Sequence, residues 1–275
     1  MSDATKRPVR KSWMVDIPAA PASVAKRPGK PPVAAARKGA QGAPPSMSMH
    51  APDTGSGLTS ERMRARMVER LAASGIRNAD VLAAMGKIPR HRFVDEGLAS
   101  RAYEDTPLPI GHGQTISQPY IVARMTELVL ADSPVPPRDA RILEIGTGCG
   151  YQAAVLANVA GEVYSIERIR ALHERARANL RALRVPNLRL VYGDGLLGLP
   201  EIAPFDAMLI AAAGDDLPDA LLSQLKLGGH ALAPLAVGGA AHEQALCLIV
   251  RTGQSTWSRT VLEAVRFVPL RAGLA

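Results

Sequence analysis

The second half of the chain alternates between short apolar runs and longer amphipathic stretches, and this alternation limits the fold more than any other feature of the sequence. Each apolar run has the length of a strand, and helix-length stretches separate most of them. Strands joined by helices form right-handed βαβ units, which build a parallel sheet with helices on both faces. The predicted strands are 141–145, 163–166, 188–191, 207–212 and 230–235, and the predicted helices are 151–160, 168–183 and 218–226.

Both flanks of this region have their own patterns. Near the C-terminus two strand-like runs follow each other without a helix, which predicts an antiparallel pair at one sheet edge. We therefore expect a Rossmann-like α/β fold: a doubly wound, mostly parallel sheet with an antiparallel C-terminal edge and a small N-terminal helical segment. The C-terminal runs are 243–250 and 256–268, the N-terminal helices are 59–75, 78–87 and one that starts at Pro119, and 107–113 is expected to be an irregular loop.

Residues 1–57 differ in composition from the rest of the chain. They carry nine Lys and Arg against three Asp, which supplies +6 of the formal net charge of +8, and they hold nine of the 22 prolines without apolar periodicity. We predict a disordered basic extension here, either simply solvated or used as an arm for an anionic partner or as a transit segment. The remaining part, 58–275, is nearly neutral, so no nucleic-acid partner is expected for this domain.

Membrane and disulfide classes are not supported by the sequence. No 18 apolar residues run together, and Asp16 and scattered prolines interrupt any signal-peptide core. Cys149 and Cys247 are too few and too far apart for a disulfide framework or a zinc site. We expect a cytoplasmic protein with reduced thiols, no membrane partner and no metal.

The strongest local signal is the run Leu-Glu-Ile-Gly-Thr-Gly-Cys-Gly at 143–150. Its glycines leave bare backbone at the carboxyl end of a strand, where open α/β sheets bind ligands. A dinucleotide and S-adenosylmethionine both suit such a loop, but the third glycine comes one residue early for G-x-G-x-x-G. Glu144 would repel a pyrophosphate and suits an ammonium and a sulfonium, which favours the methyl donor. The candidate residues are Glu144, Gly146, Thr147, Gly148 and Gly150.

Two further acidic residues follow neighbouring strands. Glu167 ends the second strand, where a carboxylate can accept both ribose hydroxyls. Asp194, beside Gly195, follows the third strand and is placed to accept from the adenine amine. Any one of these acids alone is as readily a solvated strand-end charge. Three at successive strand ends favour one binding cleft.

This combination resembles the class I S-adenosylmethionine-dependent methyltransferases, and the sequence outside the loop is similar to the protein-L-isoaspartate O-methyltransferase family in its bacterial form. The likeness covers residues 59–275. It implies methyl transfer to the free carboxylate of L-isoaspartyl residues in damaged proteins and peptides, which then return to aspartate through a succinimide. The matching motifs are Gln-Thr-Ile-Ser-Gln-Pro-Tyr at 114–120, the run 143–152, Val-Arg-Phe-Val-Pro-Leu at 265–270, and shorter motifs at 89–90, 93–96, 108–111 and 227–229.

The resemblance also implies roles for individual residues. Ser117 matches the family's active-site serine, which would orient the substrate carboxylate, and Thr115 and Ile116 would shape the same pocket. The acidic and glycine residues named above, with Thr147, match the cofactor motifs. Two departures are Cys149, where many members carry serine, and 211–216, which lacks the family's proline-containing stretch.

The implied chemistry needs no base, because a carboxylate is already ionised at pH 7. Accordingly, we expect the six histidines to lie at the surface or in loops.

The alternatives are a methyltransferase of the same fold acting on a small molecule or RNA, and a scaffold whose basic extension is the working part. Aromatic residues make up only 4% of the chain, which argues against RNA. We expect a monomer.

Overall fold

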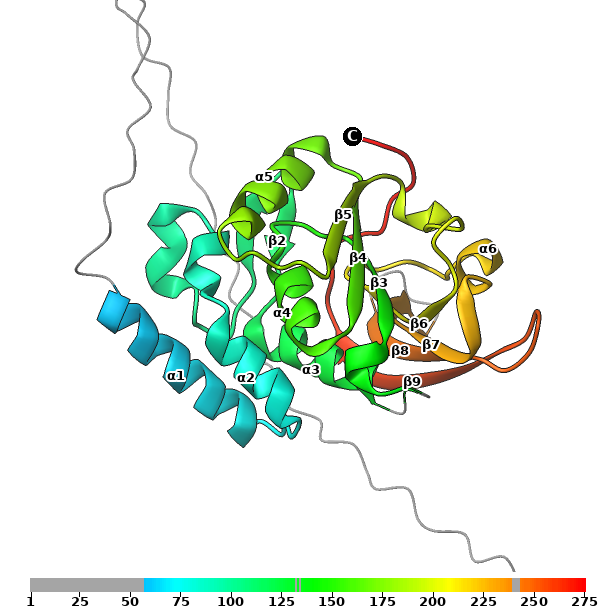
Figure 1. The fold of residues 1–275 in the computed structure, drawn as a ribbon, viewed down its shortest axis with the longest axis horizontal. Coiled ribbons are helices and arrows are strands. Elements are labelled where there is room, and N and C mark those ends of the chain that lie inside the picture. The colour runs from blue at the N-terminus through cyan, green and yellow to red at the C-terminus, as the bar shows by residue number, and fades with distance from the viewer. Residues whose placement is uncertain (1–56, 132, 134, 239–242) are drawn as a thin grey trace, which may run out of the picture. The chain divides into compact units, whose positions relative to one another are not determined.

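Seven strands form the main sheet in the order β5-β4-β3-β6-β7-β8-β9 (Figure 1). This computed structural model describes residues 57–275 apart from 132, 134 and 239–242. The first five of these strands in the chain pair in parallel, and β8 and β9 pair antiparallel at one edge, as predicted. The strands are β3 (Arg141–Ile145), β4 (Glu162–Glu167), β5 (Leu188–Tyr192), β6 (Phe205–Ile210), β7 (Leu225–Ala236), β8 (Gln244–Arg251) and β9 (Trp257–Val265).

The strand order reverses beside β3, and this reversal positions the site. From β3 the chain adds β4 and β5 on one side, then returns to add β6 and β7 on the other. Ile145 is in register with Ile166 of β4 and with Ile210 of β6. The residues that follow these three strands therefore meet at one edge of the sheet, where doubly wound folds bind their ligands.

Both faces of the sheet are covered, which explains the continuous apolar runs of the strands. Within β3, Ile142 packs into the core on one face while Leu143 and Ile145 pack into the core on the other. Five helices contribute to the first core and the short α6 to the second. Among the described residues no helix is long and apolar enough to cross a membrane. The helices are α1 (Gly57–Ala73), α2 (Ala79–Lys87), α3 (Pro119–Leu130), α4 (Tyr151–Val159), α5 (Arg170–Arg181) and α6 (Asp219–Leu222).

A hairpin replaces the loop that was expected at 107–113. Strands β1 (Leu108–Gly111) and β2 (Gln114–Ile116) pair antiparallel. The turn between them has positive φ at three successive residues, 87° at Gly111, 54° at His112 and 67° at Gly113. The two glycines that suggested an irregular loop instead permit a tight left-handed turn.

Two other expectations were wrong. The helix predicted at 218–226 ends at Leu222, because Leu225 already pairs with Phe205 as the start of β7. His230 was expected at the surface, but it lies buried in β7 with Nε2 2.9 Å from the Val129 carbonyl oxygen. The disorder predicted for residues 1–57 falls almost entirely outside the described residues.

Candidate active site

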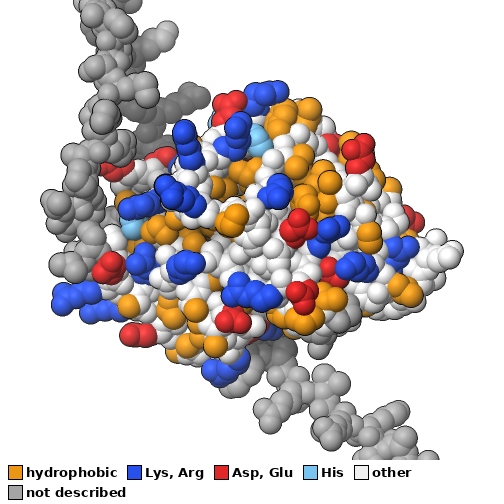
Figure 2. Space-filling model, viewed as in Figure 1, with side chains coloured by type: hydrophobic (Ala, Val, Ile, Leu, Met, Phe, Trp, Pro, Cys, Tyr) orange, Lys and Arg blue, Asp and Glu red, His pale blue; other side chains and the backbone are white. Residues whose placement is uncertain are grey.

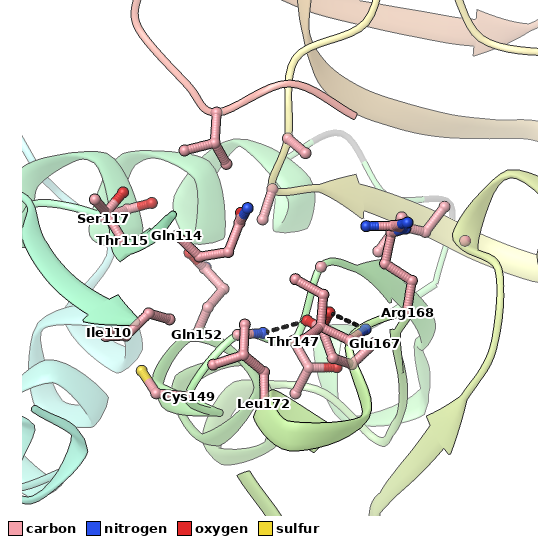
Figure 3. A pocket seen from close by; sticks show the side chains of 18 of the residues that line it. Ile110, Gln114, Thr115, Ser117, Thr147, Cys149, Gln152, Glu167, Arg168 and Leu172 are labelled. Carbon is pink, nitrogen blue, oxygen red and sulfur yellow. Dashed lines mark hydrogen bonds between the residues drawn. The ribbon is translucent and has the colours of Figure 1, made fainter. Parts of the chain in front are cut away.

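One cavity lies at the carboxyl ends of β3, β4 and β6, where the fold predicts a ligand site. Three segments that are distant in the sequence line it: the β1–β2 hairpin with the loop after it, the glycine loop after β3, and the C-terminal segment 268–271. Figure 3 shows Ser117, Thr115 and Gln114 on one side of the cavity and Thr147 and Glu167 on the other. The structure thus brings the predicted substrate loop and the predicted donor loop to one cavity.

The glycine loop exposes backbone to this cavity. Gly146 and Gly148 have φ values of 96° and 56°, a region that residues with a side chain rarely adopt. Both line the cavity together with Thr147, whose hydroxyl oxygen lies 2.6 Å from that of Ser165. Gly150 does not line it. A Cβ there would lie 2.9 Å from Cδ1 of Leu180, so this glycine allows close packing of α5.

Glu167 fixes the glycine loop and also faces the cavity. Its side chain is nearly buried, and its Oε2 accepts a hydrogen bond of 2.8 Å from the Gly148 amide (Figure 3). Its Oε1 accepts a bond of 2.9 Å from the Ile169 amide. Each carboxylate oxygen has a second lone pair. Glu167 can therefore hold the loop and still accept hydrogen bonds from ligand hydroxyls.

Glu144 has a different environment from the one expected. It is fully buried and does not line the cavity. One oxygen accepts a hydrogen bond from the Ser165 hydroxyl, and the other has no partner among the described residues. Burial raises the pKa of Glu144 to about 8, with the Ser165 bond opposing this shift and the charge of Glu167 adding to it. A charged carboxylate facing the ligand was the expectation, and the structure instead buries this side chain outside the cavity wall.

Asp194 holds the C-terminal segment rather than lining the cavity. Its Oδ1 accepts a hydrogen bond of 2.9 Å from the Leu196 amide, and its Oδ2 accepts one of 2.6 Å from the Gly273 amide. Gly195 does line the cavity, and a Cβ there would lie 2.3 Å from Cγ2 of Ile145. The predicted contact of Asp194 with adenine stays a prediction.

The substrate loop lies opposite the donor loop. Thr115, Ile116 and Ser117 all line the cavity, with Thr115 exposed, Ile116 buried and Ser117 half-buried. Part of the cavity wall was not predicted from the sequence. For the C-terminal segment the sequence signal was the motif at 265–270. This motif overlaps the lining residues, but it was given no role in the cavity. The lining residues that were not predicted are Ile110, Gln114, Val122, Ile145, Cys149, Tyr151, Gln152, Ile166, Arg168, Ile169, Leu172, Ala211, Ala212 and 268–271.

The donor set of this cavity fits an adenosyl group that carries a positive charge. Glu167 supplies a carboxylate, and the glycine loop supplies backbone that a ligand can approach closely. Apolar side chains, among them Ile169 and Leu172, offer a surface for a flat ring. The fold and this site define a class I S-adenosylmethionine-dependent methyltransferase.

Comparison with known families identifies the particular group. Residues 62–275 match the family described as protein-L-isoaspartate(D-aspartate) O-methyltransferase (PCMT), and the chain belongs to this family. The cofactor and family expected from the sequence are thereby confirmed. The roles of individual residues stay predictions.

Relatives of the same name extend the match. The protein-L-isoaspartate O-methyltransferase of Ralstonia nicotianae is 59% identical over 227 residues, which cover 79% of this chain and 71% of that protein. The one from Burkholderia mallei is 56% identical over 257 residues, covering 94% of this chain and 76% of that protein. The second match therefore includes part of residues 1–57.

Solved structures agree with the fold. A protein-L-isoaspartate O-methyltransferase superposes with a TM-score of 0.69 at 30% identity, over 77% of this chain and 67% of that one. A protein-L-isoaspartate O-methyltransferase (PCMT) from Plasmodium falciparum, in complex with S-adenosyl-L-homocysteine, superposes with a TM-score of 0.66 at 24% identity, over 76% of this chain and 98% of that one. At that identity the second structure supports the fold alone.

Proposed function

We propose that this chain transfers the methyl group of S-adenosylmethionine to the free carboxylate of L-isoaspartyl residues in damaged proteins and peptides, and so starts their repair through a succinimide. The observation that carries the proposal is that two loops line the same cavity, the Ser117 loop on one wall and the glycine loop with Glu167 on the other. Membership of the family gives the substrate class.

The donor side of the cavity binds the methyl donor and aligns it with the acceptor. Gly146, Gly148 and Gly195 provide close backbone approach, Thr147 lines the wall, and Glu167 is placed to accept hydroxyl hydrogen bonds. When bound, S-adenosylmethionine supplies a methyl group on a positively charged sulfur, which keeps the bonding electrons as the methyl carbon joins a carboxylate oxygen. Glu144, Gly150 and Asp194 support this side from outside the cavity wall.

The substrate side orients an acceptor that needs no activation. We assign Ser117 to donate a hydrogen bond to the substrate carboxylate, while Thr115 and Ile116 form the adjoining wall. A carboxylate is ionised at neutral pH, so alignment of oxygen, methyl carbon and sulfur is the main task of the protein. This fits a cavity wall whose described residues include no histidine.

Paired peptides test the proposal directly. We would incubate the full chain with methyl-labelled S-adenosylmethionine and two peptides that differ only in an aspartyl or isoaspartyl linkage. Labelling of the isoaspartyl peptide alone is the expected result. Equal labelling of both, or labelling of RNA or small molecules without the isoaspartyl peptide, would overturn the substrate assignment.

We also propose that residues 58–275 are the catalytic domain, that 1–57 are an extension, and that the protein is a cytoplasmic monomer without a nucleic-acid or membrane partner. All residues that line the cavity lie between Ile110 and Arg271, which supports the domain assignment. Both cysteines are buried and unpaired, which suits a reducing compartment. A chain of residues 58–275 should keep the full turnover and elute at monomer size, and loss of turnover would contradict this division.

A further inference from the structure

A second groove opens beside the main cavity and shares part of its wall. It continues from the cavity between the β1–β2 turn and the first turns of α5. A polypeptide bound in the main cavity can therefore continue along this groove on the same surface. The residues that line both are Gln114, Arg168, Ile169, Pro269 and Arg271, and the groove alone is lined by His112, Gly113, Arg170, Ala171, Glu174 and Ala275.

The groove carries a net positive charge. Arg168, Arg170 and Arg271 line it against two carboxylates, the side chain of Glu174 and the terminal group of Ala275. In the part of the chain that the structure describes, none of these three arginines forms a salt bridge. Other arginines of the surface do form salt bridges, namely Arg101, Arg124, Arg141 and Arg175.

The groove is also the end of a larger basic surface. Residues 168–189 contain seven arginines and one glutamate, although the whole of 58–275 is nearly neutral. In Figure 2 blue side chains crowd the part of the face where α5 lies in Figure 1. This concentration of charge favours an anionic partner that reaches the groove along α5.

Two of the guanidinium groups are held in place by contacts that leave their charge available. Arg168 donates from Nε to the Gly273 carbonyl at 2.8 Å. The guanidinium of Arg170 stacks over the Tyr192 ring, 4.4 Å from its centroid. Guanidinium groups that are already ordered lose less entropy when they bind a carboxylate.

The lining residues favour a polypeptide over a nucleic acid. The described residues that line the groove include no Phe, Tyr or Trp, so unpaired bases would find no stacking platform. We propose that the groove binds acidic side chains that flank the isoaspartyl residue of the substrate, with Arg170 and Arg271 as specificity-determining residues. This inference rests on the proposed function.

The chain between the groove and Ser117 gives an estimate of how many residues separate the preferred acidic residue from the isoaspartyl residue. Gln114 in the shared wall precedes Ser117 by three residues, and an extended chain rises about 3.3 Å per residue. A bound peptide advances by the same rise, so we expect the acidic side chain about two to four residues from the isoaspartyl residue.

Matched peptides test this specificity in the full chain. Each peptide has one isoaspartyl residue and carries Glu, Gln or Lys about three residues away, on either its N-terminal or its C-terminal side. Because exposed ion pairs are weak, we expect the KM of the best Glu peptide to be roughly three- to fivefold below that of its Gln partner. The Lys peptide should have the highest KM. Raising the salt concentration to about 1 M should abolish the difference.

Two variants connect the preference to the groove. Arg170→Gln should bring the KM ratio of the Glu and Gln peptides close to one. The matched control is Arg181→Gln, because Arg181 is an exposed arginine of the same helix that lines neither the cavity nor the groove. This variant should keep the wild-type ratio.

The outcomes separate this inference from the proposed function. Equal KM values for the Glu and Gln peptides in the wild type, or an equal loss of preference in both variants, would overturn the groove assignment while methylation itself still supports the function. A single-stranded oligoribonucleotide that inhibits more strongly than an acidic peptide without isoaspartate would also overturn it. Absence of methylation on every isoaspartyl peptide would refute the function as well.

Discussion

Two carboxylates at the ends of neighbouring strands have opposite environments, although the sequence presents them alike. Glu167 accepts two backbone amide bonds and reaches the cavity, whereas Glu144 is buried with one oxygen unpaired. Burial favours the neutral form of a carboxylate and raises the pKa of Glu144. The sequence predicts both acids as cofactor residues, but the direction of each side chain depends on packing between β3 and β4, and only Glu167 lines the cavity.

The buried carboxyl predicts a pH dependence of stability. Burial raises the pKa of Glu144 from its ordinary value of 4.5 to about 8 in the folded state. The folded protein then holds a proton that the unfolded chain has lost, so this contribution is present below the unfolded pKa and is lost as the pH rises through about 8. Glu144→Gln mimics the neutral form and has no proton to lose. Between about pH 5 and about pH 9 its free energy of unfolding should therefore fall by a few kcal/mol less than that of the wild type.

Urea unfolding across that pH range measures the effect. The comparison with the wild type cancels the contributions of other titrating groups. If the free energies of unfolding of the wild type and of Glu144→Gln change with pH in parallel, Glu144 is ionised at neutral pH, contrary to its burial in this structure.

Ser117 is predicted to act on turnover and not on donor binding. Loss of a hydrogen bond to a charged carboxylate costs about 1.5–3 kcal/mol, so Ser117→Ala should lower kcat/KM roughly ten- to hundredfold. Calorimetry should find the affinity for S-adenosyl-L-homocysteine nearly unchanged. Ser255→Ala, at an exposed loop serine, is the control and should match the wild type. An equal loss of turnover and affinity would instead make Ser117 part of the donor site.

At the scale of secondary structure, the glycine loop couples the site to the packing of α5. Gly150 combines a φ of 90° with a position where a Cβ would lie 2.9 Å from Leu180 and 3.3 Å from Ala176. Both features exclude a side chain. The third glycine of the loop therefore has a structural role, and its effect on the ligand is indirect.

We expect Gly150→Ala to lower the free energy of unfolding by about 1–3 kcal/mol, because the left-handed conformation and the contact with α5 both become unfavourable. Gly97→Ala is a suitable control, since a Cβ at Gly97 meets no atom within 4 Å and its φ is not positive. Denaturant midpoints for both variants give the comparison. A neutral Gly150→Ala would mean that α5 can shift without cost.

Strand positions were predictable because both faces of the sheet are buried, so apolar residues dominate each central strand. The predicted and observed bounds of β3 are the same, 141–145. The hairpin β1–β2 was not predictable, since its strands are short and its turn places even His112 at positive φ. Pairing with a partner strand, and not local preference, makes these residues a hairpin.

At the scale of the whole molecule, the cavity depends on contacts between the C-terminal segment and the loops that follow β4 and β5. Asp194 binds the Gly273 amide, Arg168 binds the Gly273 carbonyl, and residues 268–271 complete the cavity wall. The order of the strands explains the meeting of the loops after β3, β4 and β6. The motif at 265–270 marked the C-terminal segment, but hydrophobic periodicity does not indicate that this segment crosses to the same edge, which is why its lining role was missed.

Ligand binding should therefore stabilise the glycine loop and the C-terminal segment together. S-adenosyl-L-homocysteine at about 100 times its Kd should raise the free energy of unfolding by about 2.7 kcal/mol and the Tm by about 5–10 °C. Hydrogen exchange should slow at the glycine loop and also at 268–271, because the ligand contacts both walls of one cavity. In Glu167→Ala the same ligand concentration should give a smaller Tm shift, since about 1.5–3 kcal/mol of binding is lost. Protection confined to the glycine loop would show that the C-terminal segment does not close the site when the ligand is bound.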